Sequence, residues 1–111
     1  MSSTETTNNF SDRFYFKLQE RSTEKPEESY TSLLLSKGKK KILQKVGEEA
    51  IEVIYASASE TKQETIAEIA DLYYHLQVLM LHEGILPEDI RDALEKRMGL
   101  SGIEEKQQRK S

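Results

Sequence analysis

The sequence predicts an all-α protein that folds as a single domain. Apolar residues recur at intervals of three and four positions through most of the chain, as they do on one face of a helix. No segment alternates between apolar and polar residues with a period of two, which would indicate a strand. The chain has 111 residues, a length that fits one domain. We expect this domain to span residues 10–99, between polar tails at residues 1–9 and 100–111 that are predicted to be disordered.

Two shorter helices are predicted in the first third of the chain. Ser11 could cap the first helix, whose apolar face carries Phe10, Phe14 and Leu18. Residues 22–28 contain Pro26 and read as a loop. The second helix is predicted over residues 30–36, since Lys37 and Gly38 form a typical stop signal.

Three further helices are predicted in the rest of the chain. The first covers about residues 39–57, and the next covers about residues 62–82 and ends at Gly84. Leu86 and Pro87 open a last helix, with two acids in its first turn, which runs to Arg97. Consecutive helices joined by short turns are expected to pack as antiparallel neighbours.

Composition excludes several classes of protein. The chain contains no cysteine, which excludes disulfide bonds, zinc-finger sites and a thiol nucleophile. Its net charge of −4 argues against a nucleic-acid binder, because contacts with the phosphate backbone need a basic surface. No apolar run is long enough to cross a bilayer, and residues 1–9 lack the apolar stretch of a secretory signal. We therefore expect a cytoplasmic protein that binds neither nucleic acid nor membranes.

Carboxylates occupy unusual positions on the two long predicted helices. At 100° per residue, Glu49 falls at the shoulder of the apolar stripe of residues 39–57, while Glu48 and Glu52 lie further round. On residues 62–82, apolar side chains cover most of the helix, yet one polar stripe crosses it. That stripe consists of Glu64, Glu68, Asp71 and His75.

The simplest interpretation of such acids is a solvated helix face, which is the common case. Here the same pattern occurs on two helices that are expected to be neighbours. Glu49 and Glu52 would then face Glu68 and Asp71, and four like charges at close range need a counterion. An all-oxygen ligand set suits Mg²⁺, or alternatively Mn²⁺. His75 is more typical of a hydrogen-bonding neighbour that orients Asp71 than of a metal ligand.

A basic run directly precedes these acids. Lys37, Lys41 and Lys45 belong to a cluster of lysines with no acid before Glu48. The cluster is either a solvated charge run or a binding site for polyphosphate beside the metal ion. Gly38 could allow close approach of the backbone to a phosphate.

These residues resemble a known family. The stretches KVGEEAIEV and ADLYYHLQVL, within a similarity that runs from about Leu18 to Arg97, closely resemble phosphoribosyl-ATP pyrophosphohydrolase of histidine biosynthesis. More broadly, the chain is similar to the all-α nucleoside triphosphate pyrophosphatases of the MazG type, whose signature is Glu-x-x-Glu followed by Glu-x-x-Asp. That signature falls on Glu49 and Glu52, then on Glu68 and Asp71.

The resemblance implies an antiparallel helical bundle completed by homodimerisation, and Mg²⁺-dependent cleavage of the α–β phosphate bond of phosphoribosyl-ATP. We expect Glu49, Glu52, Glu68 and Asp71 to bind the metal, and Lys37, Lys41 and Lys45 to bind the substrate phosphates. Glu49 and Glu48 are the candidate catalytic residues. Glu48 is a further ligand or the base that orients water, or else only an exposed partner of the lysines.

Two other functions remain open from the sequence. One is a housecleaning pyrophosphatase of the same fold that acts on free or damaged nucleotides. The other is a non-catalytic dimerising helical module, in which the acids only confer solubility.

Overall fold

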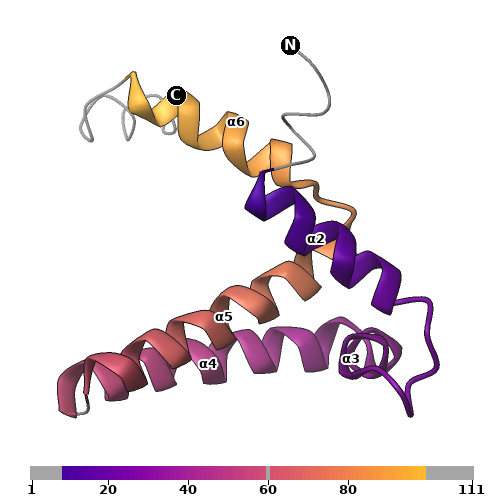
Figure 1. The fold of residues 1–111 in the computed structure, drawn as a ribbon, viewed down its shortest axis with the longest axis horizontal. Helices are drawn as coiled ribbons and strands as arrows, with labels where there is room; N and C mark the ends of the chain where they lie inside the picture. Colours follow the sequence, from indigo (N-terminus) through magenta and orange to yellow (C-terminus); the bar gives the residue numbers. More distant parts are fainter. Residues whose placement is uncertain (1–8, 60, 100–111) are drawn as a thin grey trace.

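The computed structural model describes residues 9–59 and 61–99, which form five helices and no strand (Figure 1). The helices are α2 (Phe10–Arg21), α3 (Tyr30–Lys37), α4 (Lys39–Ser59), α5 (Lys62–Glu83) and α6 (Pro87–Met98). The prediction of an all-α chain is confirmed, and the observed helix ends fall within two residues of the predicted ones. Of the tails predicted at 1–9 and 100–111, residues 1–8 and 100–111 lie outside the described residues, and Asn9 is the N-cap of α2.

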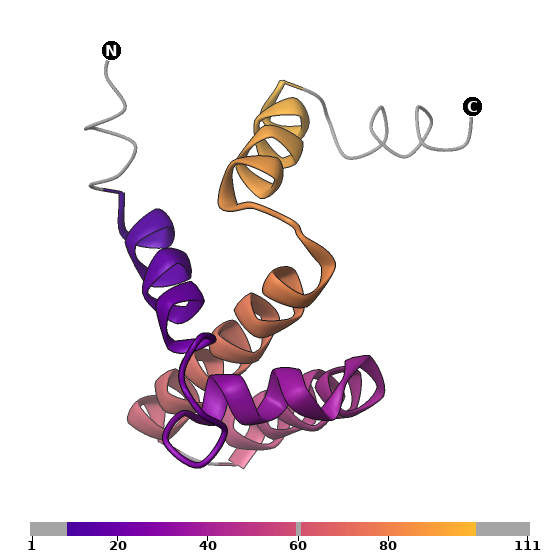
Figure 2. The same ribbon diagram turned by 90° about the vertical axis from the view of Figure 1, so that its right-hand side faces the viewer.

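The helices α4 and α5 form an antiparallel hairpin that is the largest packing unit of the chain (Figures 1 and 2). A capping box begins α5, because the Thr61 hydroxyl accepts from the Glu64 amide while the Glu64 carboxylate accepts from the Thr61 amide. Gly84, with a φ of 72°, ends α5 in the left-handed conformation that glycine adopts most easily. These local signals set the length of α5 and the position of its acids along the hairpin.

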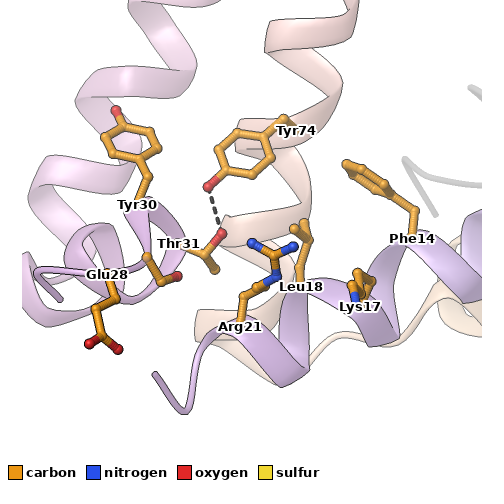
Figure 3. Close-up of a pocket in the computed structure, with 9 residues that line it drawn as sticks. Phe14, Lys17, Leu18, Arg21, Glu28, Tyr30, Thr31 and Tyr74 are labelled. Carbon is orange, nitrogen blue, oxygen red and sulfur yellow. Dashed lines mark hydrogen bonds between the residues drawn. The ribbon is translucent and has the colours of Figure 1, made fainter. Parts of the chain in front are cut away.

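The helix α3 closes one end of the hairpin. Leu34 of α3, Ile42 of α4 and Val78 of α5 form the buried core cluster, each at most 2% exposed. A side-chain hydrogen bond of 2.6 Å between Thr31 and Tyr74 joins α3 to α5 (Figure 3). The core therefore fixes the start of α4 against the second half of α5.

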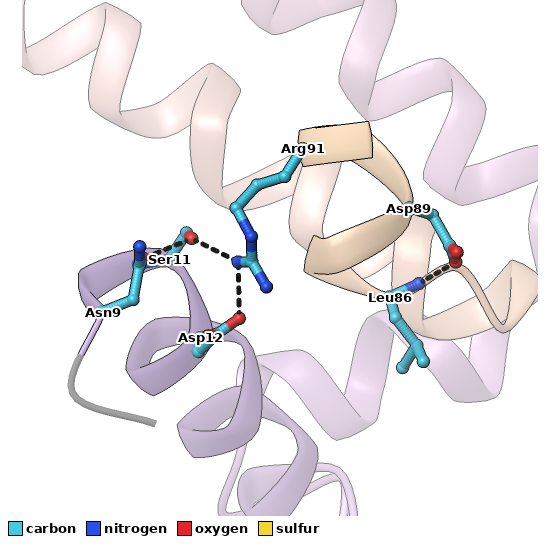
Figure 4. Close-up of polar contacts among 6 residues, drawn as sticks. All are labelled: Asn9, Ser11, Asp12, Leu86, Asp89 and Arg91. Atoms are coloured by element: carbon cyan, nitrogen blue, oxygen red, sulfur yellow. Dashed lines mark hydrogen bonds and ion pairs between the residues drawn. The ribbon is translucent and has the colours of Figure 1, made fainter. Parts of the chain in front are cut away.

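The N-cap of α2 lies two residues before the predicted one. Asn9, not Ser11, is the N-cap residue, and its side-chain oxygen accepts a hydrogen bond of 2.8 Å from the Ser11 amide. Asparagine and serine are both good caps, so the two candidates could not be separated from the sequence. The side chain of Ser11 instead faces Arg91 of α6, 3.5 Å from the guanidinium (Figure 4).

A partly buried ion pair joins α6 to α2. Arg91 donates a hydrogen bond of 2.8 Å to Asp12, whose side chain is 3% exposed (Figure 4). In Figure 2, α6 stands apart from the α4–α5 hairpin and lies beside the start of α2. This ion pair joins the two helices, while the α6 side chains Ile90, Leu94 and Met98 stay exposed. None of the described helices combines the length and the apolar character needed to span a membrane.

Candidate functional site

The α4–α5 hairpin brings three carboxylates together. Glu49 of α4 lies opposite Glu68 and Asp71 of α5, and one oxygen from each residue lies within 4.8 Å of the others. Glu49 and Glu68 are half-buried, whereas Asp71 is exposed at the edge. We call these three residues the acidic cluster. It contains three of the four metal ligands that the sequence predicted.

Three carboxylates at this separation repel one another. At 4.8 Å, each pair costs about 0.9 kcal/mol in water and about 3.5 kcal/mol at an effective dielectric constant of about 20. The half-buried position of Glu49, whose side chain is 13% exposed, puts it between these limits. Oxygen donors at this spacing fit a divalent cation such as Mg²⁺, which binds carboxylates and keeps several waters. Glu49, Glu68 and Asp71 could therefore hold such an ion.

Lys45 links the acidic cluster to the basic run. Its Nζ lies 3.6 Å from Glu49 and 3.4 Å from Glu48. Partial burial acts to lower the pKa of Lys45, but Tyr30, Glu48 and Glu49 outweigh it, so the pKa lies above its ordinary value. Lys45 therefore stays charged at the edge of the cluster, where it can balance a carboxylate or bind a phosphate oxygen.

Glu48 and Glu52 lie outside the acidic cluster. Glu48 accepts a hydrogen bond of 2.9 Å from Gln44, and this bond, followed by the contact with Lys45, lowers the pKa of Glu48. A carboxylate with a lowered pKa is a weak base, so this arrangement favours the structural role among those considered for Glu48. Glu52 is exposed on α4, and its role as a ligand stays a prediction.

The other predicted phosphate ligands differ in position. Lys41 is half-buried on α4, one turn before Lys45, whereas Lys37 is exposed at the end of α3. Lys39, between them, pairs with Glu83 at 3.3 Å. The structure thus places Lys41 and Lys45 on the same side of α4, and their contact with phosphate stays a prediction.

His75 contacts Asp71 in a different way from the predicted one. Its Nδ1 lies 2.7 Å from the main-chain carbonyl oxygen of Asp71 and not from the carboxylate. Because a carbonyl oxygen only accepts, this nitrogen carries the proton. The His75 ring is buried edge-on against Tyr30 and Tyr74. His75 therefore supports the backbone turn that carries Asp71 and leaves the carboxylate free to face the acidic cluster.

Two cations near this site were not predicted from the sequence. Lys17 and Arg21 of α2 line a hollow together with Tyr30 and Tyr74. Their spacing of four residues places them on one face of α2, and this spacing was the feature of the sequence that could have indicated a shared site. Nothing in the sequence indicated that this face turns toward α3 and α5.

Comparison with known proteins identifies the family. The sequence profile described as phosphoribosyl-ATP pyrophosphohydrolase matches residues 11–98, which is most of the chain. The chain belongs to this family. The resemblance to the phosphoribosyl-ATP pyrophosphohydrolases, expected from the stretches KVGEEAIEV and ADLYYHLQVL, is confirmed.

Relatives within the family are similar over nearly their full length. A phosphoribosyl-ATP pyrophosphatase of Sulfurisphaera tokodaii is 52% identical over 90 residues, covering 81% of this chain and 96% of the relative. A phosphoribosyl-ATP pyrophosphatase of Saccharolobus solfataricus is 47% identical over 90 residues, which again cover 81% of this chain and 96% of the relative. One of Metallosphaera sedula is 49% identical over 81 residues, covering 73% of this chain and 87% of the relative. The chain is thus an enzyme of the phosphoribosyl-ATP pyrophosphohydrolase family, and the non-catalytic alternative is not supported.

Proposed function

We propose that this enzyme hydrolyses the α–β phosphoanhydride bond of phosphoribosyl-ATP, releasing phosphoribosyl-AMP and pyrophosphate in the second step of histidine biosynthesis. The observation that carries the proposal is the acidic cluster beside a charged lysine, on a chain that belongs to the phosphoribosyl-ATP pyrophosphohydrolases. The names of its relatives support the choice of substrate over the free nucleotides of a housecleaning enzyme.

The proposed cofactor is Mg²⁺, with Mn²⁺ as the alternative ion. Glu49, Glu68 and Asp71 would hold it, and Glu52, one turn beyond Glu49, is the candidate for a fourth ligand. When bound, such an ion neutralises charge on the phosphates and lowers the pKa of a coordinated water. Lys45 holds the Glu49 carboxylate in place and, with Lys41, would donate hydrogen bonds to the polyphosphate. Glu48 keeps Lys45 in position.

A pyrophosphate-release assay tests the proposal directly. Purified enzyme should release pyrophosphate from phosphoribosyl-ATP when Mg²⁺ is present and not in excess chelator. Glu49→Gln should lose most of this activity while its helical circular dichroism is unchanged, because the substitution keeps the shape of the side chain. Glu95→Gln, which neutralises an exposed acid of α6, is the matched control. Activity that is unchanged in Glu49→Gln would refute the acidic cluster as the reactive site.

The same assay decides between the two related activities. Faster release from dUTP or from ordinary nucleoside triphosphates than from phosphoribosyl-ATP would indicate the housecleaning function instead.

We also infer that the enzyme works as a homodimer. Large apolar side chains on the outer face of the α4–α5 hairpin are more than half exposed, a pattern that marks a protein interface. They are Ile51, Ile54, Tyr55, Ile66 and Ile69. Next to them, Phe10, Phe14 and Tyr73 form an aromatic cluster, with ring centroids between 5.6 and 6.5 Å apart. Apolar side chains cover most of α5, and a second copy would supply the contacts that a single chain lacks.

Light scattering after size-exclusion chromatography tests the dimer. The wild type should have the mass of two chains, and Ile54→Glu should shift it toward one, since Ile54 is 67% exposed and a charge there costs little in the monomer. Glu95→Gln is again the control. A monomeric wild type at micromolar concentration would refute the inference.

A further inference from the structure

A hollow lies between α2, α3 and the second half of α5, outside the acidic cluster. It has a volume of about 430 Å³. Its principal lining residues are Phe14, Lys17, Arg21, Tyr30, Thr31 and Tyr74 (Figure 3). We call it the α2–α3 hollow. Its size fits part of a nucleotide, and neither the acidic cluster nor the basic run of α4 accounts for it.

The charged residues of the hollow favour an anion. Lys17 and Arg21 lie one turn apart on α2. No hydrogen bond or ion pair within the described chain holds the Arg21 side chain, and Lys17 pairs only with Glu20, at 3.6 Å on the exposed surface. Glu28 also lines the hollow, and in Figure 3 its carboxylate points away from the tyrosine rings. Two cations against one carboxylate leave an excess of positive charge.

Aromatic rings form another wall of the hollow. Tyr30 and Tyr74 are stacked, with ring centroids 6.1 Å apart and planes at 20°. The hydrogen bond between Tyr74 and Thr31 fixes the Tyr74 ring. Phe14 extends this apolar surface from the α2 side (Figure 3). Aromatic surface next to a guanidinium group suits a ligand that carries both a ring or sugar and a phosphate.

The hollow lies close to the acidic cluster along α5 and α4. Tyr30 lies in the hollow and interacts electrostatically with Lys45, and Lys45 contacts Glu49 at 3.6 Å. On α5, Tyr74 follows Asp71 by three residues, which is about 4.5 Å along the helix axis. A molecule with one end at the acidic cluster would therefore have its other end within reach of the α2–α3 hollow.

We propose that the α2–α3 hollow binds the phosphoribosyl arm of the substrate, with Arg21 and Lys17 on the 5′-phosphate of that arm. This inference rests on the proposed function, because phosphoribosyl-ATP carries a ribose phosphate on its adenine ring in addition to the triphosphate. The acidic cluster takes the triphosphate, which ATP shares. The α2–α3 hollow takes the group that ATP lacks, and it thereby determines specificity.

Titration calorimetry with two nucleotides tests the assignment. Phosphoribosyl-AMP has the arm, whereas AMP lacks it, and neither can release pyrophosphate. With Mg²⁺ present, the wild type should bind phosphoribosyl-AMP more tightly than AMP. Arg21→Gln should weaken binding of phosphoribosyl-AMP about tenfold to hundredfold, as expected for the loss of a charge-assisted hydrogen bond, and should leave AMP binding unchanged. Lys17→Gln should act in the same direction with a smaller factor.

Arg13→Gln is the matched control, because Arg13 is an exposed arginine of α2 that does not line the hollow. Equal weakening of both nucleotides by Arg21→Gln would overturn the proposal and assign the hollow to the shared phosphates. Unchanged binding of both would overturn it as well. These outcomes are distinct from failure of the proposed function, which would appear as a wild type that releases no pyrophosphate from phosphoribosyl-ATP.

Discussion

The effect of Asp71→Asn on the free energy of unfolding should change sign when Mg²⁺ is added. Asp71 faces both Glu49 and Glu68 within 4.8 Å, so Asp71→Asn removes two repulsive pairs. Because Asp71 is exposed, the lower figure of about 0.9 kcal/mol for each pair applies. In chelator, the variant should therefore unfold with a free energy about 1–2 kcal/mol higher than that of the wild type.

Bound Mg²⁺ should invert this order. An ion present at about 100 times its dissociation constant adds about 2.7 kcal/mol to the free energy of unfolding of a protein that binds it only when folded. The wild type should gain this amount, whereas Asp71→Asn, with one ligand replaced by an amide, should gain much less. The wild type should then be the more stable protein.

Urea denaturation followed by circular dichroism, in chelator and at several Mg²⁺ concentrations, measures both effects. Asp92→Asn, which neutralises an exposed acid of α6, should be insensitive to Mg²⁺ beyond the general effect of salt. If Asp71→Asn and the wild type were equally stable in chelator and gained equally from Mg²⁺, the reasoning about a converging ion site would be refuted.

Three other predictions concern individual side chains. Lys45→Gln should lower kcat/KM for phosphoribosyl-ATP at least tenfold, since it removes a partner of Glu49 and a phosphate donor, while Lys39→Gln, at an exposed ion pair, should have little effect. Glu64→Ala should lower the melting temperature at pH 7. Hydrogen bonds with Thr61 lower the pKa of Glu64 in the folded state. The stabilisation by the Glu64 carboxylate is therefore present above the unfolded pKa and is lost as the pH falls through the folded pKa. The difference in melting temperature between Glu64→Ala and the wild type should vanish in acid. Ile42→Ala, at a position 1% exposed, should lower the free energy of unfolding by about 2–5 kcal/mol in urea titrations.

The sequence was sufficient to predict the helices because their ends carry local signals. Pro87 at the first position of α6, Gly38 after α3 and Gly84 after α5 act within a turn of their own positions. The cap of α2 was predicted incorrectly because Asn9 and Ser11 are both competent caps, and in the structure the Ser11 side chain contacts Asn9 and Arg91 instead of capping the helix.

The periodicity of one hairpin was enough to predict that three acids converge. Glu49 on the shoulder of α4 and Glu68 with Asp71 on α5 follow from helical spacing and antiparallel packing. The position of Glu52 depends on the rotation and register of α4 against α5, which spacing alone does not define.

The roles of buried and distant groups were harder to predict. His75 bonds to a main-chain oxygen because its ring is confined by Tyr30 and Tyr74, and such confinement is a tertiary property. The α2–α3 hollow is built from three helices, and the relative placement of its walls depends on contacts between residues far apart in the chain.

The acidic cluster comes from a single contiguous stretch of polypeptide. Glu49 and Glu68 are nineteen positions apart, on the two arms of a hairpin that spans residues 39–83. Among the described residues, α2, α3 and α6 contribute no carboxylate to the cluster, so an ion bound there would link only the two arms of this segment. The hairpin alone therefore carries the three carboxylates, whatever length of sequence lies before α2 or beyond α6.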